Sequence, residues 1–313
     1  MTRISITATS ILAALVAVVF IYQAGNRETL SAAQFRADSG YGELRLSDGV
    51  TAYRSYGAGR ASDAPTVIIV HGGTLGSMAY QGYVAPLVMA GYRVVLYDQY
   101  GRGFSDRAAA PLSIDLMRRQ LLDLMDALDI ERAHLFGVSF GGAIIARFAA
   151  DHGDRVRSLA YQVPVIEGAS VSPTIMLTRM PIIGPALMRF LAIPAIIARG
   201  ESFGTQSEEA RRVVTHFKQQ FSVEGTERQM RQMLIGDALS DRMADHRRVG
   251  ASGVAAQFVY ATDDSEIAAE QVEAALALYK APQVHQYTGG HFFSSGKTLE
   301  LAEKLDGFFK SVD

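Results

Sequence analysis

The sequence predicts an α/β protein with a mostly parallel, doubly wound sheet whose chain is interrupted by a helical insertion. Two observations carry this prediction. Short β-rich runs alternate with helical patterns along most of the 313 residues, and repeated strand–helix units build parallel sheets covered on both faces. The alternation stops between residues 167 and 251, where helical stretches follow one another without a strand.

The last six of the eight strand candidates are short, β-rich and mostly apolar, as expected for strands that are buried on both faces. The eight candidates span residues 43–46, 51–56, 66–70, 92–97, 133–136, 158–163, 257–260 and 283–287. A hairpin-type turn, Ser47-Asp48-Gly49, separates the first two, so the sheet is expected to start antiparallel. Helical periodicity is clearest at 113–128 and 266–279.

The insertion at 167–251 is predicted to be a helical lid within a catalytic domain that spans residues 43–313. Its first part, residues 175–197, is apolar, and its later part is charged. The apolar part either packs against the core or forms a groove for an acyl or aromatic group, a use to which flexible methionine side chains are suited.

The N-terminal segment 1–25 is predicted to be a transmembrane anchor or a signal segment, followed by a connector at 26–42. Residues 4–22 carry no charge over a length close to the roughly 20 residues that cross a bilayer as a helix. Arg3 precedes the run, which weakly favours a cytoplasmic N-terminus and an extracytoplasmic catalytic domain. Cleavage near residues 31–33 would instead release a secreted or periplasmic protein, and a buried soluble helix is a third alternative.

Composition excludes several kinds of site. The chain has no cysteine, which excludes disulfides, thiolate metal sites and a cysteine nucleophile. Its formal net charge is -2, and its basic residues are interleaved with acidic ones, so we expect no nucleic-acid partner. We also expect no cofactor and no metal ion.

Ser139 is the predicted nucleophile. It lies in the sequence Gly-Val-Ser-Phe-Gly at 137–141, directly between the strand 133–136 and a helical run at 143–150. Glycines flank so tight a turn because side chains do not fit there, and the turn projects the serine hydroxyl above the sheet edge at a helix N-terminus. The alternative is a glycine-rich turn with an incidental serine.

His291 is the predicted base. A serine hydroxyl needs a general base, usually an imidazole held by a carboxylate. In folds whose serine lies on such a turn, the triad residues follow one another in the order serine, acid, histidine. Of the seven histidines, only His285 and His291 follow both the serine and the candidate acids in the sequence. His285 lies within a strand pattern, whereas His291 follows the end of the strand 283–287, where ligand chemistry in open α/β sheets gathers.

Asp264 is the predicted acid of the triad. Asp263, Asp264 and Glu266 all follow the strand 257–260. The carboxylates that are not catalytic suit a helix cap or first turn. Asp263 remains the first alternative, and Glu167, after the preceding strand, is the second.

Two backbone N–H groups are the predicted oxyanion donors, those of Phe140 and Gly73. Phe140 directly follows the nucleophile. Gly73 belongs to the loop His-Gly-Gly-Thr at 71–74, whose glycines allow a close backbone approach. As an alternative, the glycines serve only the turn and His71 packs beneath it.

Together these motifs resemble the α/β-hydrolase superfamily, over about residues 43–311. The resemblance rests on His-Gly-Gly at 71–73, Asp-Gln-Tyr-Gly-Arg-Gly-Phe-Ser-Asp at 98–106, the turn at 137–141, Asp264, and Gly-His at 290–291. The similar branch contains bacterial carboxylesterases, monoacylglycerol lipases and carbon–carbon bond hydrolases. The resemblance implies an α/β-hydrolase fold and makes 98–106 a structural loop without a catalytic role. Unlike the family, the chain has Ala261 three residues before the acid and no proline after it.

The predicted function is hydrolysis of carboxylic esters, including lipid-like esters or acyl glycerides, through an acyl-enzyme on Ser139. The alternative enzyme is a carbon–carbon bond hydrolase of ring-fission diketones with the same triad. A catalytically silent, membrane-tethered binding protein is the alternative from another class. The expected partners are a small-molecule ester and a membrane.

Overall fold

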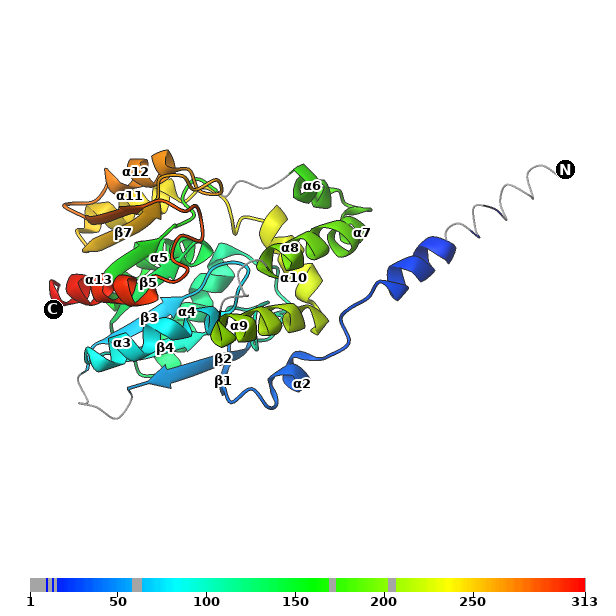
Figure 1. Cartoon of the computed structure of the whole chain (residues 1–313), viewed down its shortest axis with the longest axis horizontal. Coiled ribbons are helices and arrows are strands. Elements are labelled where there is room, and N and C mark those ends of the chain that lie inside the picture. The colour runs from blue at the N-terminus through cyan, green and yellow to red at the C-terminus, as the bar shows by residue number, and fades with distance from the viewer. Residues whose placement is uncertain are drawn as a thin grey trace.

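An eight-stranded sheet forms the centre of the protein (Figure 1). The computed structural model describes residues 10, 13, 16–57, 64–168, 173–201 and 207–312. The strands lie in the order β1-β2-β4-β3-β5-β6-β7-β8. The two pairings of β2, with β1 and with β4, are antiparallel, and all the others are parallel. The predicted mostly parallel sheet with an antiparallel start is confirmed.

The strand bounds follow the apolar runs closely. They are β1 Gly42–Leu46, β2 Gly49–Tyr56, β3 Thr66–Val70, β4 Arg93–Tyr97, β5 Ala133–Val138, β6 Val156–Gln162, β7 Ala256–Ala261 and β8 Gln283–Tyr287. Every residue of β3, β5 and β7 is buried. The central strands are therefore covered on both faces, as their composition predicts.

Two layers of helices cover the sheet. One apolar cluster joins alternate residues of β3, Val67 and Ile69, to the helices α3 and α13. The other joins Ile68 and Val70 to the opposite layer. The bounds are α3 Val84–Met89 and α13 Thr298–Lys310 on the first face, and α4 Ile114–Ala127, α5 Phe140–Asp151, α11 Met243–Ser252 and α12 Ala269–Leu276 on the second.

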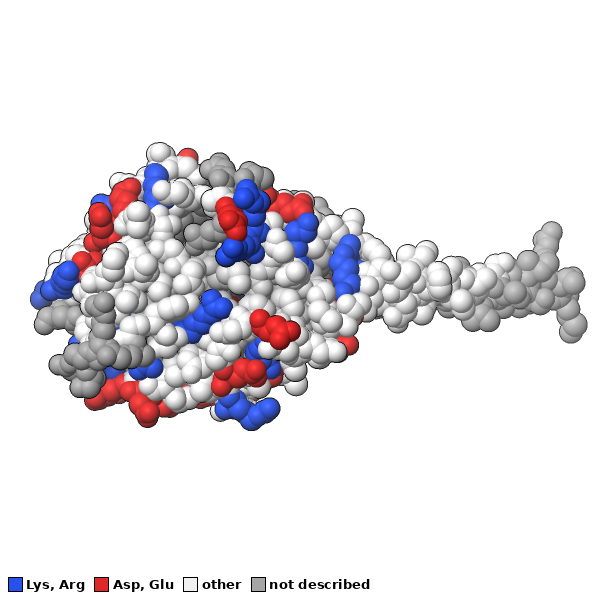
Figure 2. Space-filling view, turned by 60° about the horizontal axis from the view of Figure 1, so that its bottom comes forward, with Lys and Arg blue, Asp and Glu red and all other residues white. Residues whose placement is uncertain are grey.

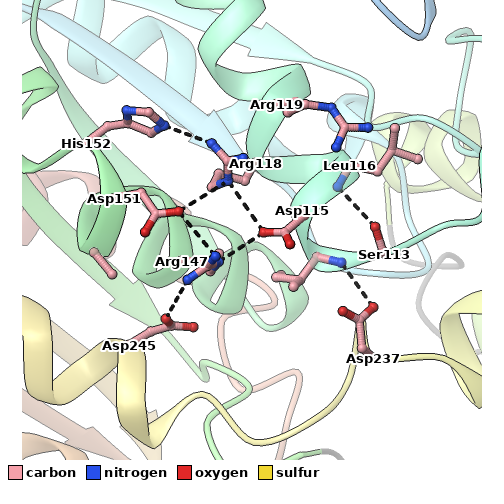
Figure 3. Close-up of polar contacts among 12 residues, drawn as sticks. Ser113, Asp115, Leu116, Arg118, Arg119, Arg147, Asp151, His152, Asp237 and Asp245 are labelled. Carbon is pink, nitrogen blue, oxygen red and sulfur yellow. Dashed lines mark hydrogen bonds and ion pairs between the residues drawn. The ribbon is translucent and has the colours of Figure 1, made fainter.

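An ion-pair network ties three helices of the second layer together (Figure 3). Arg147 of α5 lies 3.0 Å from Asp115 of α4, 3.3 Å from Asp151 of its own helix and 3.3 Å from Asp245 of α11. Helix α11 also packs against α5. It thus belongs to the layers of the body, so the predicted insertion 167–251 includes one helix that is not part of the lid.

The lid helices gather at one end of the molecule (Figure 1). They are α6 Pro173–Met176, η3 Leu177–Arg179, α7 Gly184–Leu187, the π-helical turn η4 Met188–Ala192, α8 Ile193–Glu201, α9 Glu208–Gln219, η5 Gln220–Ser222 and α10 Thr226–Ile235. In the described part of 167–251 there is no strand, only an isolated bridge between Leu30 and Val223. The apolar stretch 175–197 is partly buried and partly exposed. Met188 and Ile193 are buried, whereas Ile182 is 92% exposed.

The N-terminal helix, of which residues 10, 13 and 16–24 are described, extends away from the body (Figure 1). The predicted membrane segment 4–22 lies largely outside the described residues. No helix among the residues that the structure describes has the length and apolar character needed to cross a membrane, so the predicted membrane helix is not supported. The connector 26–42 contains a short helix, α2 Ala32–Arg36, whose N-terminus is closed by a capping box between Ser31 and Gln34.

Candidate active site

Ser139 lies on a strained turn between β5 and α5. Its φ of 52° and ψ of −116° belong to a region that favours glycine. The flanking glycines are required by close backbone contacts. A Cβ at Gly137 would lie 2.6 Å from the carbonyl oxygen of Gly141, and a Cβ at Gly141 would collide with that of Val70. The turn is therefore the tight strand-to-helix elbow that the glycine spacing predicts.

Three predicted residues are joined by hydrogen bonds. His291 Nε2 lies 3.0 Å from Ser139 Oγ, and His291 Nδ1 lies 2.8 Å from Asp264 Oδ2. Because a carboxylate only accepts, Nδ1 donates, and Nε2 of the neutral ring is left to accept the serine proton. The side chains of Asp264 and His291 are 1% and 8% exposed. This arrangement can deprotonate a serine hydroxyl at the moment of attack.

Asp264 is held in place by the start of the segment that follows it. Its Oδ1 accepts from the backbone N–H groups of Glu266, at 2.8 Å, and Ile267, at 3.1 Å. Its other oxygen is left for the imidazole. These bonds fix the carboxylate in the orientation that holds the histidine tautomer.

Asp263 has a different place. It is exposed, and its carboxylate accepts from the backbone N–H groups of Gly289 and Gly290, both at 2.9 Å. These two bonds, that of Gly290 first, hold the pKa of Asp263 below its ordinary value. Asp263 thus fastens the loop that carries His291, and within the described chain Asp264 is the carboxylate hydrogen-bonded to that imidazole.

The remaining alternatives lie elsewhere. Glu167 is exposed at the start of the lid segment. His285 lies in β8, with its Nε2 3.3 Å from the side-chain nitrogen of Gln257, which also contacts the carbonyl of Lys304 in α13. This is the environment expected of a strand histidine that faces a helix.

The predicted oxyanion loop lies beside the serine. A Cβ at Gly72 would be 3.6 Å from Ser139 Cβ, and a Cβ at Gly73 would be 3.5 Å from Phe140 Cβ. Within the part of the chain that the structure describes, neither the Gly73 N–H nor the Phe140 N–H donates to a protein acceptor. Both are available to an oxyanion.

His71 does more than pack beneath this loop. The Gln99 N–H donates to its Nε2 at 2.9 Å, so its proton is on Nδ1, which donates to the Gly72 carbonyl at 2.7 Å. Burial, opposed by the Asp98 carboxylate, lowers the pKa of His71 to about 4, which keeps the ring neutral near pH 7. His71 therefore orients the peptide that carries the Gly73 N–H.

Helix α10 of the lid lies against the oxyanion loop. Met233 of α10 lies so close that its Sδ would be 2.9 Å from a Cβ at Gly73. Met230 and Met233 also contact the guanidinium of Arg102, a buried residue of the loop 98–106. The motif Gly-Arg-Gly at 101–103 is the feature of the sequence that could have pointed to Arg102. Because 98–106 is predicted to be a structural loop, the sequence alone assigns Arg102 no role at the site.

Comparisons with known proteins show which chains and folds this one is similar to. Residues 65–188 match the family model described as alpha/beta hydrolase fold. Over 132 residues the chain is 39% identical to 2-hydroxy-6-oxo-6-phenylhexa-2,4-dienoate hydrolase of Comamonas testosteroni, which covers 41% of this chain and 44% of that protein. Over 128 residues it is 39% identical to a 2-hydroxy-6-oxononadienedioate/2-hydroxy-6-oxononatrienedioate hydrolase of Paraburkholderia xenovorans (strain LB400), covering 40% and 41%.

The crystal structure of the enol-lactonase from Burkholderia xenovorans LB400 has the same fold, with a TM-score of 0.70 and 19% identity over 86% of this chain and all of that one. The match to the family model and the likeness to this structure show that the chain has the α/β-hydrolase fold. The resemblance read from the motifs is confirmed. The chain aligns with only about two fifths of the length of each curated relative, 44% of the Comamonas protein and 41% of the Paraburkholderia protein.

Asp264→Asn tests the difference between the two aspartates. An amide can present its NH₂ to the imidazole and hold the wrong tautomer, so we expect kcat to fall by roughly 10⁴-fold. Asp263→Asn loosens only the loop and is expected to cost about tenfold or less. Steady-state kinetics, with thermal denaturation to show that both variants fold, make the comparison. Equal losses, or a larger loss for Asp263→Asn, would contradict it.

Proposed function

We propose that this α/β-hydrolase cleaves its substrate by nucleophilic attack of Ser139 on a carbonyl carbon. The observation that carries the proposal is the unbroken hydrogen-bond chain from Ser139 through His291 to Asp264. His291 takes the serine proton as the serine oxygen adds to the carbonyl. The Asp264 carboxylate orients the ring and stabilises the imidazolium that forms.

The negative charge that develops on the carbonyl oxygen needs fixed donors. Phe140 and Gly73 supply them, because their N–H groups flank Ser139 and have no protein acceptor within the described chain. Collapse of the tetrahedral intermediate breaks the bond to the leaving group, which takes the proton from His291. Water then releases the acyl group from Ser139 by the same steps in reverse.

The bond that breaks is best argued from the relatives. Two of them are dienoate hydrolases, so we place carbon–carbon bond cleavage of a ring-fission diketone ahead of ester hydrolysis. In that reaction the leaving group is a carbon atom, and its charge is delocalised into the dienoate as the bond to the acyl carbon breaks. This order reverses the one that the sequence alone favours.

Ester hydrolysis remains the second candidate because of the lid. Met233 and Met230 bring flexible apolar side chains over the oxyanion loop, and such side chains accommodate acyl chains. The same triad and donors serve an ester, whose leaving group is an alkoxide.

A substrate panel separates the two candidates. Purified enzyme is assayed with 2-hydroxy-6-oxo-6-phenylhexa-2,4-dienoate, p-nitrophenyl esters of increasing chain length and a monoacylglycerol. The proposal predicts the highest kcat/KM for the dienoate and loss of all activities in Ser139→Ala. A kcat/KM for esters that exceeds the dienoate value by tenfold or more would replace the first candidate by the second. Turnover by Ser139→Ala at the wild-type rate would contradict both.

We also propose that the protein works at a membrane surface, with its catalytic domain on the extracytoplasmic side. The support is the uncharged run 4–22 together with exposed apolar side chains, which include Phe20 on the N-terminal helix and Ile182 on the lid. Tyr22 packs edge-on against Phe190 of the lid, so the N-terminal helix meets the lid directly. On the face shown in Figure 2 the projecting segment is uncharged where it is described.

Fractionation of a bacterial host that expresses the full chain tests this placement. We expect the protein in the membrane fraction after a carbonate wash, and we expect protease added to spheroplasts to digest it. Recovery in the soluble cytoplasmic fraction would contradict the proposal.

A further inference from the structure

Arg102 is a buried cation whose contacts lie between the oxyanion loop and the lid. Its side chain comes from the loop 98–106 and is almost completely buried. Nε donates to the carbonyl of Gly73, and Nη1 donates to the carbonyl of Gly101 at 2.9 Å. Nη2 contacts the sulfur atoms of Met233, at 3.0 Å, and Met230, at 3.4 Å, both on α10.

Among the described residues, no carboxylate forms an ion pair with this guanidinium. None of the ion pairs between described residues includes Arg102. Burial, assisted by Arg107, lowers the pKa of Arg102 to about 9, which still leaves it charged near pH 7. A buried charge is costly without a paired partner. An apolar side chain of similar size would fill the space at a lower cost, so the value of the arginine must lie in the bonds that it donates.

The hydrogen bond from Arg102 to Gly73 means that the peptides on both sides of Gly73 are held. The peptide before this residue is held through the Gly72 carbonyl by His71 Nδ1. The peptide after it is held through the Gly73 carbonyl by Arg102. A glycine has the freest backbone of any residue, so the direction of its N–H depends on how both neighbouring peptides are held.

Gln220 of the lid forms a second contact with the oxyanion loop and with the loop 98–106. Gln220 of η5 donates to the carbonyl of Thr74 at 3.1 Å, and its side-chain oxygen accepts from the N–H of Gly103 at 3.2 Å. The lid therefore contacts the residue after Gly73 and the residue after Arg102 at the same time. A shift of the lid would be transmitted to both loops.

We propose that Arg102 is a positioning residue that fixes the Gly73 end of the oxyanion hole and connects it to the lid helix α10. Arg102 does not touch the reacting atoms. It acts through the Gly73–Thr74 peptide, and the contacts with Met230 and Met233 make the geometry of the hole depend on a seated lid. This inference rests on the proposed serine mechanism and extends it.

Two substitutions at Arg102 test the inference. Arg102→Met keeps most of the side-chain volume and removes every donor, whereas Arg102→Lys keeps a charge that can reach a single carbonyl. The matched control is Arg228→Met, because Arg228 also joins α10 to the body, at the carbonyl of Ala108, without contacting the oxyanion loop. Circular dichroism and thermal denaturation establish which variants fold, and Arg102→Lys serves if Arg102→Met does not.

The readout must separate a displaced oxyanion donor from general loosening. We measure kcat and KM for the best substrate of the panel, and the inhibition constant of 2,2,2-trifluoroacetophenone, whose adduct with Ser139 places an oxyanion in the hole. We expect Arg102→Met to lower kcat by roughly 10- to 100-fold. The inhibition constant should rise by a similar factor, with KM within about twofold of wild type. Arg102→Lys should recover part of both losses, and Arg228→Met should change neither.

A folded Arg102→Met enzyme with a kcat within twofold of wild type would overturn the inference. So would a lower kcat with an unchanged inhibition constant, because the loss would then not arise in the oxyanion hole. If wild-type protein forms no adduct with the ketone and has no Ser139-dependent activity, the proposed serine mechanism itself fails. The two failures are thus distinguishable.

Discussion

The strained backbone of Ser139 is the constraint on which the rest of the site depends. A non-glycine residue at a φ of 52° costs about 1–3 kcal/mol, and it persists only where its surroundings enforce it. Here the Ser139 N–H donates to the Gln162 carbonyl at 2.9 Å, and the Ser139 carbonyl accepts from Val165 at 3.1 Å and Gly142 at 2.9 Å. The buried strands β5 and β6 supply the rigidity that keeps the hydroxyl raised and the Phe140 N–H free.

The other groups of the site lie on loops around Ser139, and each loop is held by its own hydrogen bonds. Asp263 holds the loop of His291, while Asp264 is oriented by the backbone of Glu266 and Ile267. His71 and Arg102 hold the two peptides of Gly73. Ionised or polar side chains that bond backbone groups thus carry most of the positioning.

The parts of the site that depend on local pattern could be predicted from the sequence. The bounds of β3 and β8 coincide with the predicted runs, and the turn at 137–141 is recognisable because its glycines meet a steric demand between neighbouring segments. Elimination among seven histidines by chain order and strand position selected His291, which the structure places within hydrogen-bond distance of Ser139 and Asp264. Asp263 and Asp264 follow the same strand, so only their burial and partners distinguish them.

What could not be predicted depends on contacts between distant segments. The place of Arg102 depends on Met230 and Met233, more than 120 residues later in the chain, and nothing in the local pattern brings these residues together. The division of the apolar stretch 175–197 into a buried part and an exposed part likewise depends on tertiary packing. The preference between ester and carbon–carbon cleavage came from relatives, since the triad chemistry is common to both.

Covalent labelling of Ser139 tests the central claim most directly. Folded wild-type protein is incubated with a fluorophosphonate probe, digested and analysed by mass spectrometry, beside Ser139→Ala and His291→Ala. The account predicts one adduct on Ser139 in the wild type, none in Ser139→Ala and a strongly slowed reaction in His291→Ala. A wild-type protein that folds and carries no adduct on Ser139, or one that is labelled as fast without His291, would contradict it.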